Sequence, residues 1–320
     1  MLSAQPQDEE EQPQEESVVQ NIYGLGSFEY SDSSSFERQR NKKPTTFLGK
    51  FATTVSDTWK QFSQGFTEVS QKKALKYPSL LCFGDSLTEY SQHISTSEGR
   101  GWGALLANHY STKADVIIRG FAGYNTRWAL YILPKVLHAL DLSCLKLVVI
   151  FLGANDCTVP ESPQHVGVEE YASNLFKMIK VVRNLQSKFT KAELLLITPP
   201  PLVEEAWRED CRQKNKPVFR KASRVEEYVN ACKRVAAEAH VPCLDLWTSI
   251  QQQSQWQMFF TDGLHFAEKG NDYVFQQLKA TISDNFPSLD AERMTPVFPH
   301  WTEIDPVHFT SALEKCFSTS

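Results

Sequence analysis

Ser86 stands in the segment 84–87, with the sequence GDSL, directly after a short apolar run. A serine at a strand-to-helix turn presents its hydroxyl at the edge of a sheet, where it could attack a carbonyl carbon. The free backbone N–H groups of the turn can receive the negative charge that then develops. A serine that only caps a helix has the same short pattern, so this segment alone supports both interpretations equally.

Two later loops carry groups that could stabilise an oxyanion. Gly123 lies in the loop 119–126 and could present its N–H toward the serine without a side chain in the way. Asn155, in the GAND segment at 153–156, carries an amide N–H, a neutral donor suited to a negatively charged oxygen. Each has a structural alternative, because glycine is a common turn residue and asparagine forms Asx-turns.

The segment 261–265, with the sequence TDGLH, combines an acid and a base. Asp262 and His265 can lie on one loop, so that the carboxylate holds one ring nitrogen and the other nitrogen faces a serine from elsewhere in the chain. An Asp-x-x-His pair is common and means little alone. Metal binding is the competing function, but the eight histidines form no HExxH motif and no cluster, so we expect neither a metal nor another cofactor.

Together, these four segments supply every part of an acyl-transfer site. Ser86 is the candidate nucleophile, His265 its base and Asp262 the group that orients the base. Gly123 and Asn155 add a backbone donor and a side-chain donor. Four such blocks in this order are improbable by coincidence, and the set therefore favours function over the separate structural alternatives.

The elements that must position these residues alternate along the chain. Short, nearly continuous apolar runs are typical of strands covered on both faces, and apolar residues at steps of three and four are typical of helices. Such alternation predicts a parallel sheet with right-handed crossovers and a three-layer α/β/α domain, with ligands at the carboxyl ends of the strands. The expected strands are 80–83, 116–118, 147–152, 194–197 and 242–246, and the expected helices are 101–110, 127–140, 168–188, 222–240 and 268–284.

In these four segments the sequence resembles the GDSL, or SGNH, hydrolase superfamily. Its four motifs match at 84–87, Gly123, 153–156 and 262–265, and they span nearly all of residues 79–285. Within the superfamily the chain is similar to the isoamyl acetate-hydrolysing esterases. That similarity lies in the segments 123–130, 151–156 and 261–266 and in the tail with His300, Trp301, Glu303 and Asp305.

The resemblance implies a flavodoxin-like fold with a mainly parallel five-stranded sheet and a metal-free mechanism. It implies that Ser86 attacks an ester carbonyl, that His265 takes the serine proton and that Asp262 steadies the imidazolium. The oxyanion hole implied is the backbone N–H of Ser86 and Gly123 together with the side chain of Asn155. The substrate expected is a small or medium carboxylic ester.

Two other functions remain open from the sequence. The same triad would serve a lysophospholipase or thioesterase that acts on lipid esters. A module that binds a lipid or a protein partner without catalysis could keep the fold, although such a module has no need of all of Ser86, Asn155, Asp262 and His265.

Several residues near the motifs admit more than one role. Arg127 and Trp128 could contact substrate, or they could pack and form a salt bridge on a helix. Trp207 follows a run of prolines that should hold its segment extended, and it could line the acyl pocket. Turn-forming roles are expected for the acidic residues Asp85, Asp156 and Asp245.

Composition narrows the partners and the compartment. The net charge of -5 at pH 7 gives no reason to expect a nucleic acid partner, because phosphate binding needs a basic face. No stretch approaches the ~20 apolar residues of a membrane-spanning helix, and the acidic start lacks the pattern of a signal peptide. The seven cysteines form no CxxC pair. These features predict a reduced, cytoplasmic protein.

The chain divides into three parts by composition. Residues 1–45 are rich in Gln, Glu, Ser and Asn, which predicts disorder. In the segment 46–76, apolar side chains recur at helical spacing from Phe47 to Val69 among lysines. This pattern favours a helix that docks on the following domain or on a protein partner, with a membrane surface as the alternative. Residues 77–320 form the expected catalytic domain.

Overall fold

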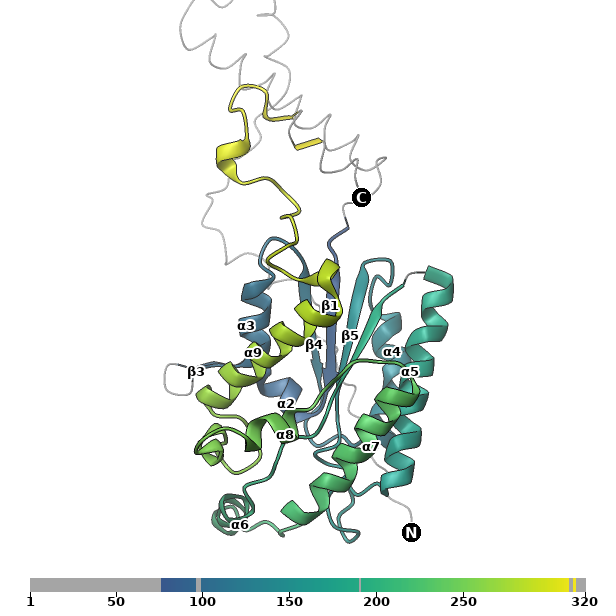
Figure 1. The fold of residues 1–320 in the computed structure, drawn as a ribbon, viewed down its shortest axis with the longest axis vertical. Coiled ribbons are helices and arrows are strands. Elements are labelled where there is room, and N and C mark those ends of the chain that lie inside the picture. The colour runs from purple at the N-terminus through teal and green to yellow at the C-terminus, as the bar shows by residue number, and fades with distance from the viewer. Residues whose placement is uncertain (1–75, 96–98, 190, 311–312, 315–320) are drawn as a thin grey trace, which may run out of the picture. The chain divides into compact units, whose positions relative to one another are not determined.

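The computed structural model describes residues 76–95, 99–189, 191–310 and 313–314 (Figure 1). The expected disordered segment 1–45 and the amphipathic segment 46–76 lie outside the described residues, except for Lys76. The expected catalytic domain is described over most of its length.

A parallel five-stranded sheet forms the centre of the domain, in the order β4-β1-β5-β6-β7. This is the flavodoxin-like order, in which the first strand lies between the second and the third. All six residues of β1 are buried, as expected of a strand covered on both faces. The parallel sheet predicted from the sequence is thereby confirmed. Its strands are β1 (Ser79–Gly84), β4 (Asp115–Gly120), β5 (Leu145–Phe151), β6 (Glu193–Ile197) and β7 (Cys243–Leu244).

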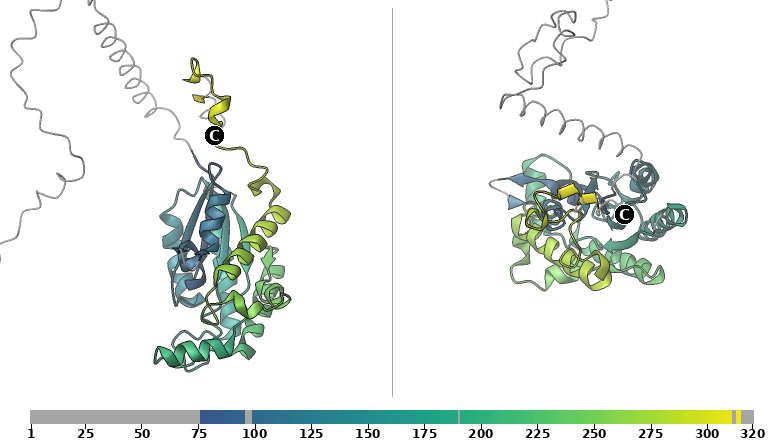
Figure 2. Two further views of the ribbon diagram at one scale, coloured as in Figure 1. Left: turned by 90° about the vertical axis from the view of Figure 1, so that its left-hand side faces the viewer. Right: turned by 90° about the horizontal axis from the view of Figure 1, so that it is seen from above.

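Helices cover both faces of the sheet, which gives the three layers that the sequence predicts (Figures 1 and 2). On one face α3 (Trp102–His109) packs against α9 (Glu268–Asn285). On the other face α5 (Val168–Phe189) packs between α4 (Thr126–His138) and α7 (Val225–Glu238). The five helices agree with the expected ranges to within a few residues at each end.

The helical periodicity read from the sequence corresponds to the buried faces. The apolar stripe of α7 is buried, and its members are Val225, Tyr228, Val229, Cys232 and Val235. Full burial of one large apolar side chain stabilises a fold by about 1.5–3 kcal/mol, so such a stripe holds its helix on the sheet. At the start of α4, the Asn125 side chain accepts the N–H of Trp128 at 3.0 Å and caps the helix.

Several short elements were not predicted from the sequence. The strand expected at 242–246 ends at Leu244, because Asp245 caps the helix α8 (Leu246–Gln251) by accepting the N–H of Thr248. The segment after the prolines, expected to be extended, contains α6 (Glu204–Gln213). The other additions are α2 (Ser86–Glu89), the antiparallel pair β2 (Ile94–Ser95) and β3 (Gly99–Arg100), and the 3-10 turns η2 (Tyr90–Gln92), η3 (Ala222–Arg224), η4 (Trp256–Phe259), η5 (Pro287–Leu289) and η6 (Trp301–Glu303).

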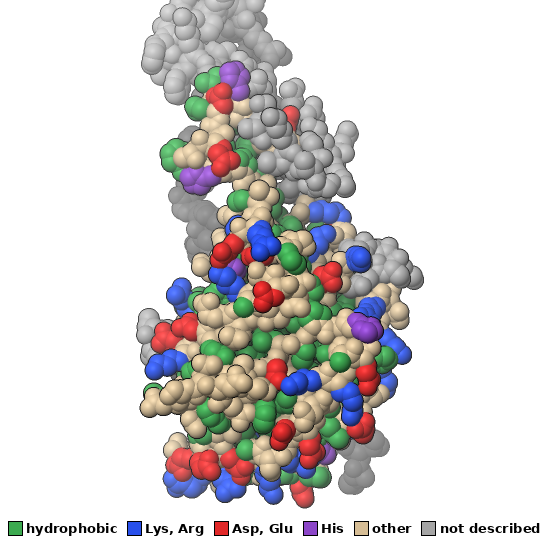
Figure 3. All heavy atoms as spheres, viewed as in Figure 1, with side chains coloured by type: hydrophobic (Ala, Val, Ile, Leu, Met, Phe, Trp, Pro, Cys, Tyr) green, Lys and Arg blue, Asp and Glu red, His purple; other side chains and the backbone are tan. Residues whose placement is uncertain are grey.

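The charge distribution and the character of the helices are relevant to binding of nucleic acid and of membranes. On the face drawn in Figure 3, basic and acidic side chains are interspersed among the residues shown in colour. No helix within the described ranges has both the length and the apolar character needed to cross a membrane.

Candidate active site

The strand order brings three of the predicted segments to one edge of the sheet. β1 lies between β4 and β5, and its last residue, Gly84, is in register with Gly120 on one side and Phe151 on the other. The loops that follow these three strand ends carry Ser86, Gly123 and Asn155. The nucleophile candidate therefore leaves the sheet between the two loops that carry the candidate oxyanion donors.

Ser86 is the first residue of α2, and the residues before it are suited to a tight turn. The Asp85 side chain accepts the N–H of Leu87 at 2.9 Å and caps the helix. A Cβ at position 84 would lie 2.2 Å from Oγ1 of Thr88 and 2.4 Å from the carbonyl oxygen of Phe151, so only glycine fits there. Ser86 follows two residues after this tightly packed glycine, and it is 7% exposed.

Asp262 and His265 share one closed loop. The N–H of Thr261 donates to the carbonyl oxygen of His265 at 2.8 Å, which joins the two ends of the loop. Gly263 has a φ of +92°, and a Cβ there would lie 2.4 Å from the carbonyl oxygen of Val203. Glycine is therefore required both by the backbone conformation and by the contact with the segment before α6.

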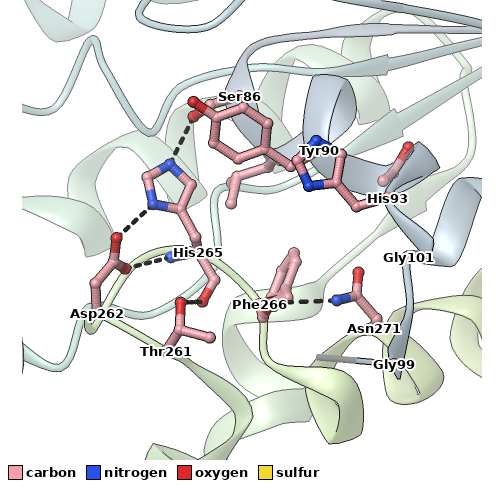
Figure 4. A pocket seen from close by; sticks show the side chains of 12 residues that line it. Ser86, Tyr90, His93, Gly99, Gly101, Thr261, Asp262, His265, Phe266 and Asn271 are labelled. Carbon is pink, nitrogen blue, oxygen red and sulfur yellow. Dashed lines mark hydrogen bonds and ion pairs between the residues drawn. The ribbon is translucent and has the colours of Figure 1, made fainter. Parts of the chain in front are cut away.

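A continuous hydrogen-bonded chain joins the three residues predicted as a triad (Figure 4). Oγ of Ser86 is 2.9 Å from Nε2 of His265, and Nδ1 of His265 is 2.6 Å from Oδ2 of Asp262. The other carboxylate oxygen of Asp262 accepts the backbone N–H groups of Leu264 at 2.9 Å and His265 at 2.8 Å. The carboxylate is thus held on both sides, and it fixes the orientation of the ring.

The electrostatics of Asp262 suit this position. Burial raises the pKa of the carboxyl group, but the hydrogen bonds and charge from His265 and the N–H of Leu264 outweigh burial and lower the pKa to about 2. Asp262 is therefore ionised at neutral pH. An ionised carboxylate accepts a hydrogen bond from Nδ1–H of His265, which leaves a lone pair on Nε2 facing the Ser86 hydroxyl.

Asn155 is 2% exposed, and its Nδ2 donates to the carbonyl oxygen of Tyr124 at 2.8 Å. Its Oδ1 accepts from Arg220 at 2.6 Å and from Gln164 at 3.2 Å. Gln164 also donates to the carbonyl oxygen of Gly123 at 2.8 Å. The structure thus links the loops of Gly123 and Asn155 directly, although neither residue lines the cavity at Ser86.

A cavity of about 280 Å³ opens beside the Ser86 hydroxyl. It runs between the loop of Asp262 and His265 and the turn that follows α2, as Figure 4 shows. The ring of Tyr90 lies 5.2 Å from the ring of His265, between centroids, and forms one wall. The remaining lining is Leu87, Ser91, His93, Gly99, Gly101, Thr261, Phe266 and Asn271.

The three acidic residues expected to have structural roles make contacts of that kind. Asp156 accepts the N–H of Thr126 at 3.0 Å, and burial raises its pKa to about 7. Burial likewise raises the pKa of the helix-capping Asp85 to about 6. Asp245 caps α8 through the N–H of Thr248. None of these three carboxylates lines the cavity at Ser86.

Three other sequence candidates are placed away from this cavity. Arg127 forms an exposed salt bridge with Glu170 at 2.7 Å, as in the packing interpretation, and its neighbour Trp128 is 40% exposed. Trp207 does not line the cavity, although its ring lies 6.5 Å from the His265 ring, between centroids. It packs instead against the guanidinium of Arg220, which lies 5.0 Å from the ring centroid.

Four residues of the site were missed in the sequence: Tyr90, His93, Gln164 and Arg220. Tyr90 had a usable signal, because it stands one helical turn after Ser86. Gln164 and Arg220 lie in irregular loops, where spacing does not predict which side chains meet. Within the described part of the chain, no group of three or more His, Cys, Asp or Glu residues is placed to hold a metal ion.

Comparisons with known proteins identify the family of this chain. The GDSL-like Lipase/Acylhydrolase family matches residues 82–273. A human protein described as isoamyl acetate-hydrolyzing esterase 1 homolog is 40% identical over 236 residues, which cover 72% of this chain and 90% of that relative. A GDSL esterase/lipase of Arabidopsis thaliana is 35% identical over 248 residues, which cover 74% of this chain and 98% of that relative.

Two solved structures share the fold. The carbohydrate acetylesterase Est24 from Sinorhizobium meliloti superposes with a TM-score of 0.51 at 22% identity, covering 65% of this chain and 100% of that chain. A lipase/acylhydrolase from Enterococcus faecalis superposes with a TM-score of 0.50 at 23% identity, covering 68% of this chain and 98% of that chain. On the family match and the similar relatives, the chain belongs to the GDSL-like lipase/acylhydrolase family of ester hydrolases.

Proposed function

We propose that this chain hydrolyses carboxylic esters of short to medium length through a Ser-His-Asp triad. In this proposal Ser86 is the nucleophile, His265 the general base and acid, and Asp262 the group that orients the imidazole. The oxyanion donors are the backbone N–H groups of Ser86 and Gly123 and the amide N–H of Asn155. No metal or other cofactor takes part.

The observation that carries the proposal is the chain of two hydrogen bonds from Asp262 through His265 to Ser86, at 2.6 and 2.9 Å. A nucleophile within hydrogen-bond reach of a base, with the base held by a third group, is the arrangement that activates a serine. A serine that only capped a helix would not need an imidazole held in one tautomer and aimed at its hydroxyl. The adjoining cavity gives an ester access to that hydroxyl.

The reaction follows from these contacts. Oγ of Ser86 attacks the ester carbonyl carbon while Nε2 of His265 takes the hydroxyl proton, and Asp262 stabilises the imidazolium. The oxyanion accepts hydrogen bonds from the three donors, each typically worth ~10²–10³ in rate. When the carbon–oxygen bond breaks, His265 protonates the leaving alcohol. Water, deprotonated by the same ring, then releases the acid from Ser86.

The dimensions of the cavity favour a small substrate. Its volume of about 280 Å³ is slightly below the range of roughly 300–1,000 Å³ that is typical of ligand pockets. A short acyl group with a short alcohol matches this volume better than a long lipid chain does. The name of the human relative refers to hydrolysis of isoamyl acetate, a small ester.

Hydrolysis of p-nitrophenyl esters from acetate to palmitate tests the proposal. We expect the highest kcat/KM with short chains, with loss of activity in Ser86→Ala and full activity in the control Ser249→Ala, whose hydroxyl lies on α8 outside the cavity. A maximum at long chains would favour the lipid-ester alternative instead. If wild type neither hydrolyses any ester nor reacts at Ser86 with a fluorophosphonate, the chain is a binding module and the proposal is wrong.

A further inference from the structure

Arg220 is a buried cation next to the proposed oxyanion hole. It is 7% exposed, and one of its terminal nitrogens donates to Oδ1 of Asn155 at 2.6 Å while the other donates to the carbonyl oxygen of Ala154. The face of the guanidinium rests on the Trp207 ring. None of the ion pairs of the described residues includes Arg220. Burial lowers the pKa of its guanidinium, and the charges of Asp85 and Asp262, which lie beyond ion-pair distance, act against that effect. Burial of a cation without a paired carboxylate is costly, so its retention needs a reason.

The contacts of Asn155 show what Arg220 does locally. An amide side chain has two lone pairs on oxygen and two N–H bonds. Arg220 and Gln164 occupy Oδ1, which fixes the opposite side of the amide as nitrogen. One N–H of that nitrogen donates to the carbonyl oxygen of Tyr124. The second N–H is the one available to an oxyanion, and the three partners together fix its direction.

The guanidinium of Arg220 is also suited to polarising the Asn155 amide. Its two terminal nitrogens donate to a backbone oxygen and a side-chain oxygen of consecutive residues, Ala154 and Asn155, in the fixed planar geometry that a rotatable ammonium group lacks. A hydrogen bond from a cationic guanidinium to Oδ1 draws electron density from the amide nitrogen and strengthens its remaining N–H as a donor. Arg220 is buried, so little water screens the effect of its charge on the Asn155 amide.

We propose that Arg220 is a positioning residue of the oxyanion hole, which orients and polarises the Asn155 amide. This inference rests on the proposed ester hydrolysis. Because Arg220 acts through Asn155, its effect belongs to the transition state, where charge appears on the carbonyl oxygen. Loss of Arg220 then lowers kcat and leaves KM nearly unchanged, since binding of the uncharged ester does not use this donor.

A double-mutant cycle between Arg220 and Asn155 tests this, with kcat and KM for p-nitrophenyl acetate and the melting temperature measured on each protein. We expect Arg220→Gln to lower kcat by roughly 10–100-fold, a part of the ~10²–10³ carried by one oxyanion donor. Arg220→Lys, which keeps the charge and loses the planar geometry, should recover part of that loss. In an Asn155→Ala background the same Arg220 substitutions should change kcat less than about threefold, because coupled residues are not additive.

The control is Arg183→Gln, which removes another guanidinium that donates to a backbone carbonyl, that of Ala239 at 2.6 Å, and that does not line the cavity. It should leave kcat unchanged. If Arg220→Gln fails to fold, the cycle is run with Arg220→Lys alone.

Equal losses of kcat in the wild-type and Asn155→Ala backgrounds would show a general packing role and overturn the inference. So would a kcat for Arg220→Gln within about threefold of wild type. A wild-type protein without Ser86-dependent hydrolysis would instead contradict the proposed function, and this inference would fall with it.

Discussion

Substitution of Asn for Asp262 keeps the size of the side chain and reverses the hydrogen bond on which the base depends. Oδ1 of Asp262 accepts the N–H groups of Leu264 and His265 at 2.9 and 2.8 Å, so the amide oxygen of Asn must take that place. The NH₂ group then faces Nδ1 of His265, where the carboxylate oxygen lies at 2.6 Å in the native protein. An amide nitrogen only donates, so the ring must carry its proton on Nε2, toward Ser86.

A ring protonated on Nε2 cannot take the proton of the Ser86 hydroxyl. In Ser-His-Asp proteases the same reversal lowers kcat roughly 10⁴-fold, which corresponds to about 5 kcal/mol in the activation free energy. We therefore expect kcat/KM of Asp262→Asn for p-nitrophenyl acetate to fall by about 10⁴. The melting temperature should change little, because the two backbone hydrogen bonds to Oδ1 survive.

The matched control is Asp245→Asn, another acidic residue at a strand end, which caps α8 and does not line the cavity. Its kcat/KM should stay close to the wild-type value. A loss of less than about tenfold in Asp262→Asn, with the fold intact, would refute the claim that tautomer control by this carboxylate is essential.

Three further predictions follow from the geometry. Gly263→Ala should lower the melting temperature and activity together, because its Cβ would lie 2.4 Å from the carbonyl oxygen of Val203; an unchanged melting temperature would contradict this. Burial raises the pKa of Asp156 to about 7, so the folded state binds this proton more tightly than the unfolded state and stability falls as pH rises from about 4 to 7. Asp156→Asn should therefore flatten the decline of melting temperature from pH 5 to 8, whereas parallel profiles would contradict this assignment. Arg127→Ala breaks the exposed ion pair with Glu170. It should change the free energy of unfolding, measured by urea denaturation, by at most about 1 kcal/mol, and it should leave kcat/KM unchanged. A tenfold loss of activity would instead indicate a substrate contact.

The sheet and its large helices could be predicted from the sequence because their signal is local and repeated. The buried strands appear as continuous apolar runs, and α7 shows its stripe at helical spacing. The short elements could not be predicted in this way. α8 begins because one side chain, Asp245, caps it by accepting the N–H and the hydroxyl of Thr248, and these two hydrogen bonds end the strand that the apolar run predicted to be longer. In α6 the ion pair between Arg208 and Glu204, one helical turn apart, supports a helix where prolines suggested an extended chain.

The structure brings together the three residues that the sequence predicts as a triad, whereas two side chains that contact Asn155, those of Arg220 and Gln164, were not predicted. Ser86, Asp262 and His265 lie in short motifs whose spacing reflects their chemistry, and the structure brings them together. Arg220 and Gln164 contact Asn155, although they lie 65 and 9 residues from it in the sequence, in loops of irregular conformation. Contacts between such side chains depend on the whole fold, so they cannot be predicted from local spacing in the sequence.

The two hydrogen bonds of the proposed triad differ in when they can form. Asp262 and His265 are three residues apart, so their contact forms as soon as their own loop closes. Ser86 and His265 are 179 residues apart and meet only once the sheet has joined the two ends of the domain. Contacts of such sequence separation form late in folding. On the proposed mechanism, a chain under synthesis that already displays Ser86 therefore stays inactive until residue 265 has left the ribosome and docked against the sheet.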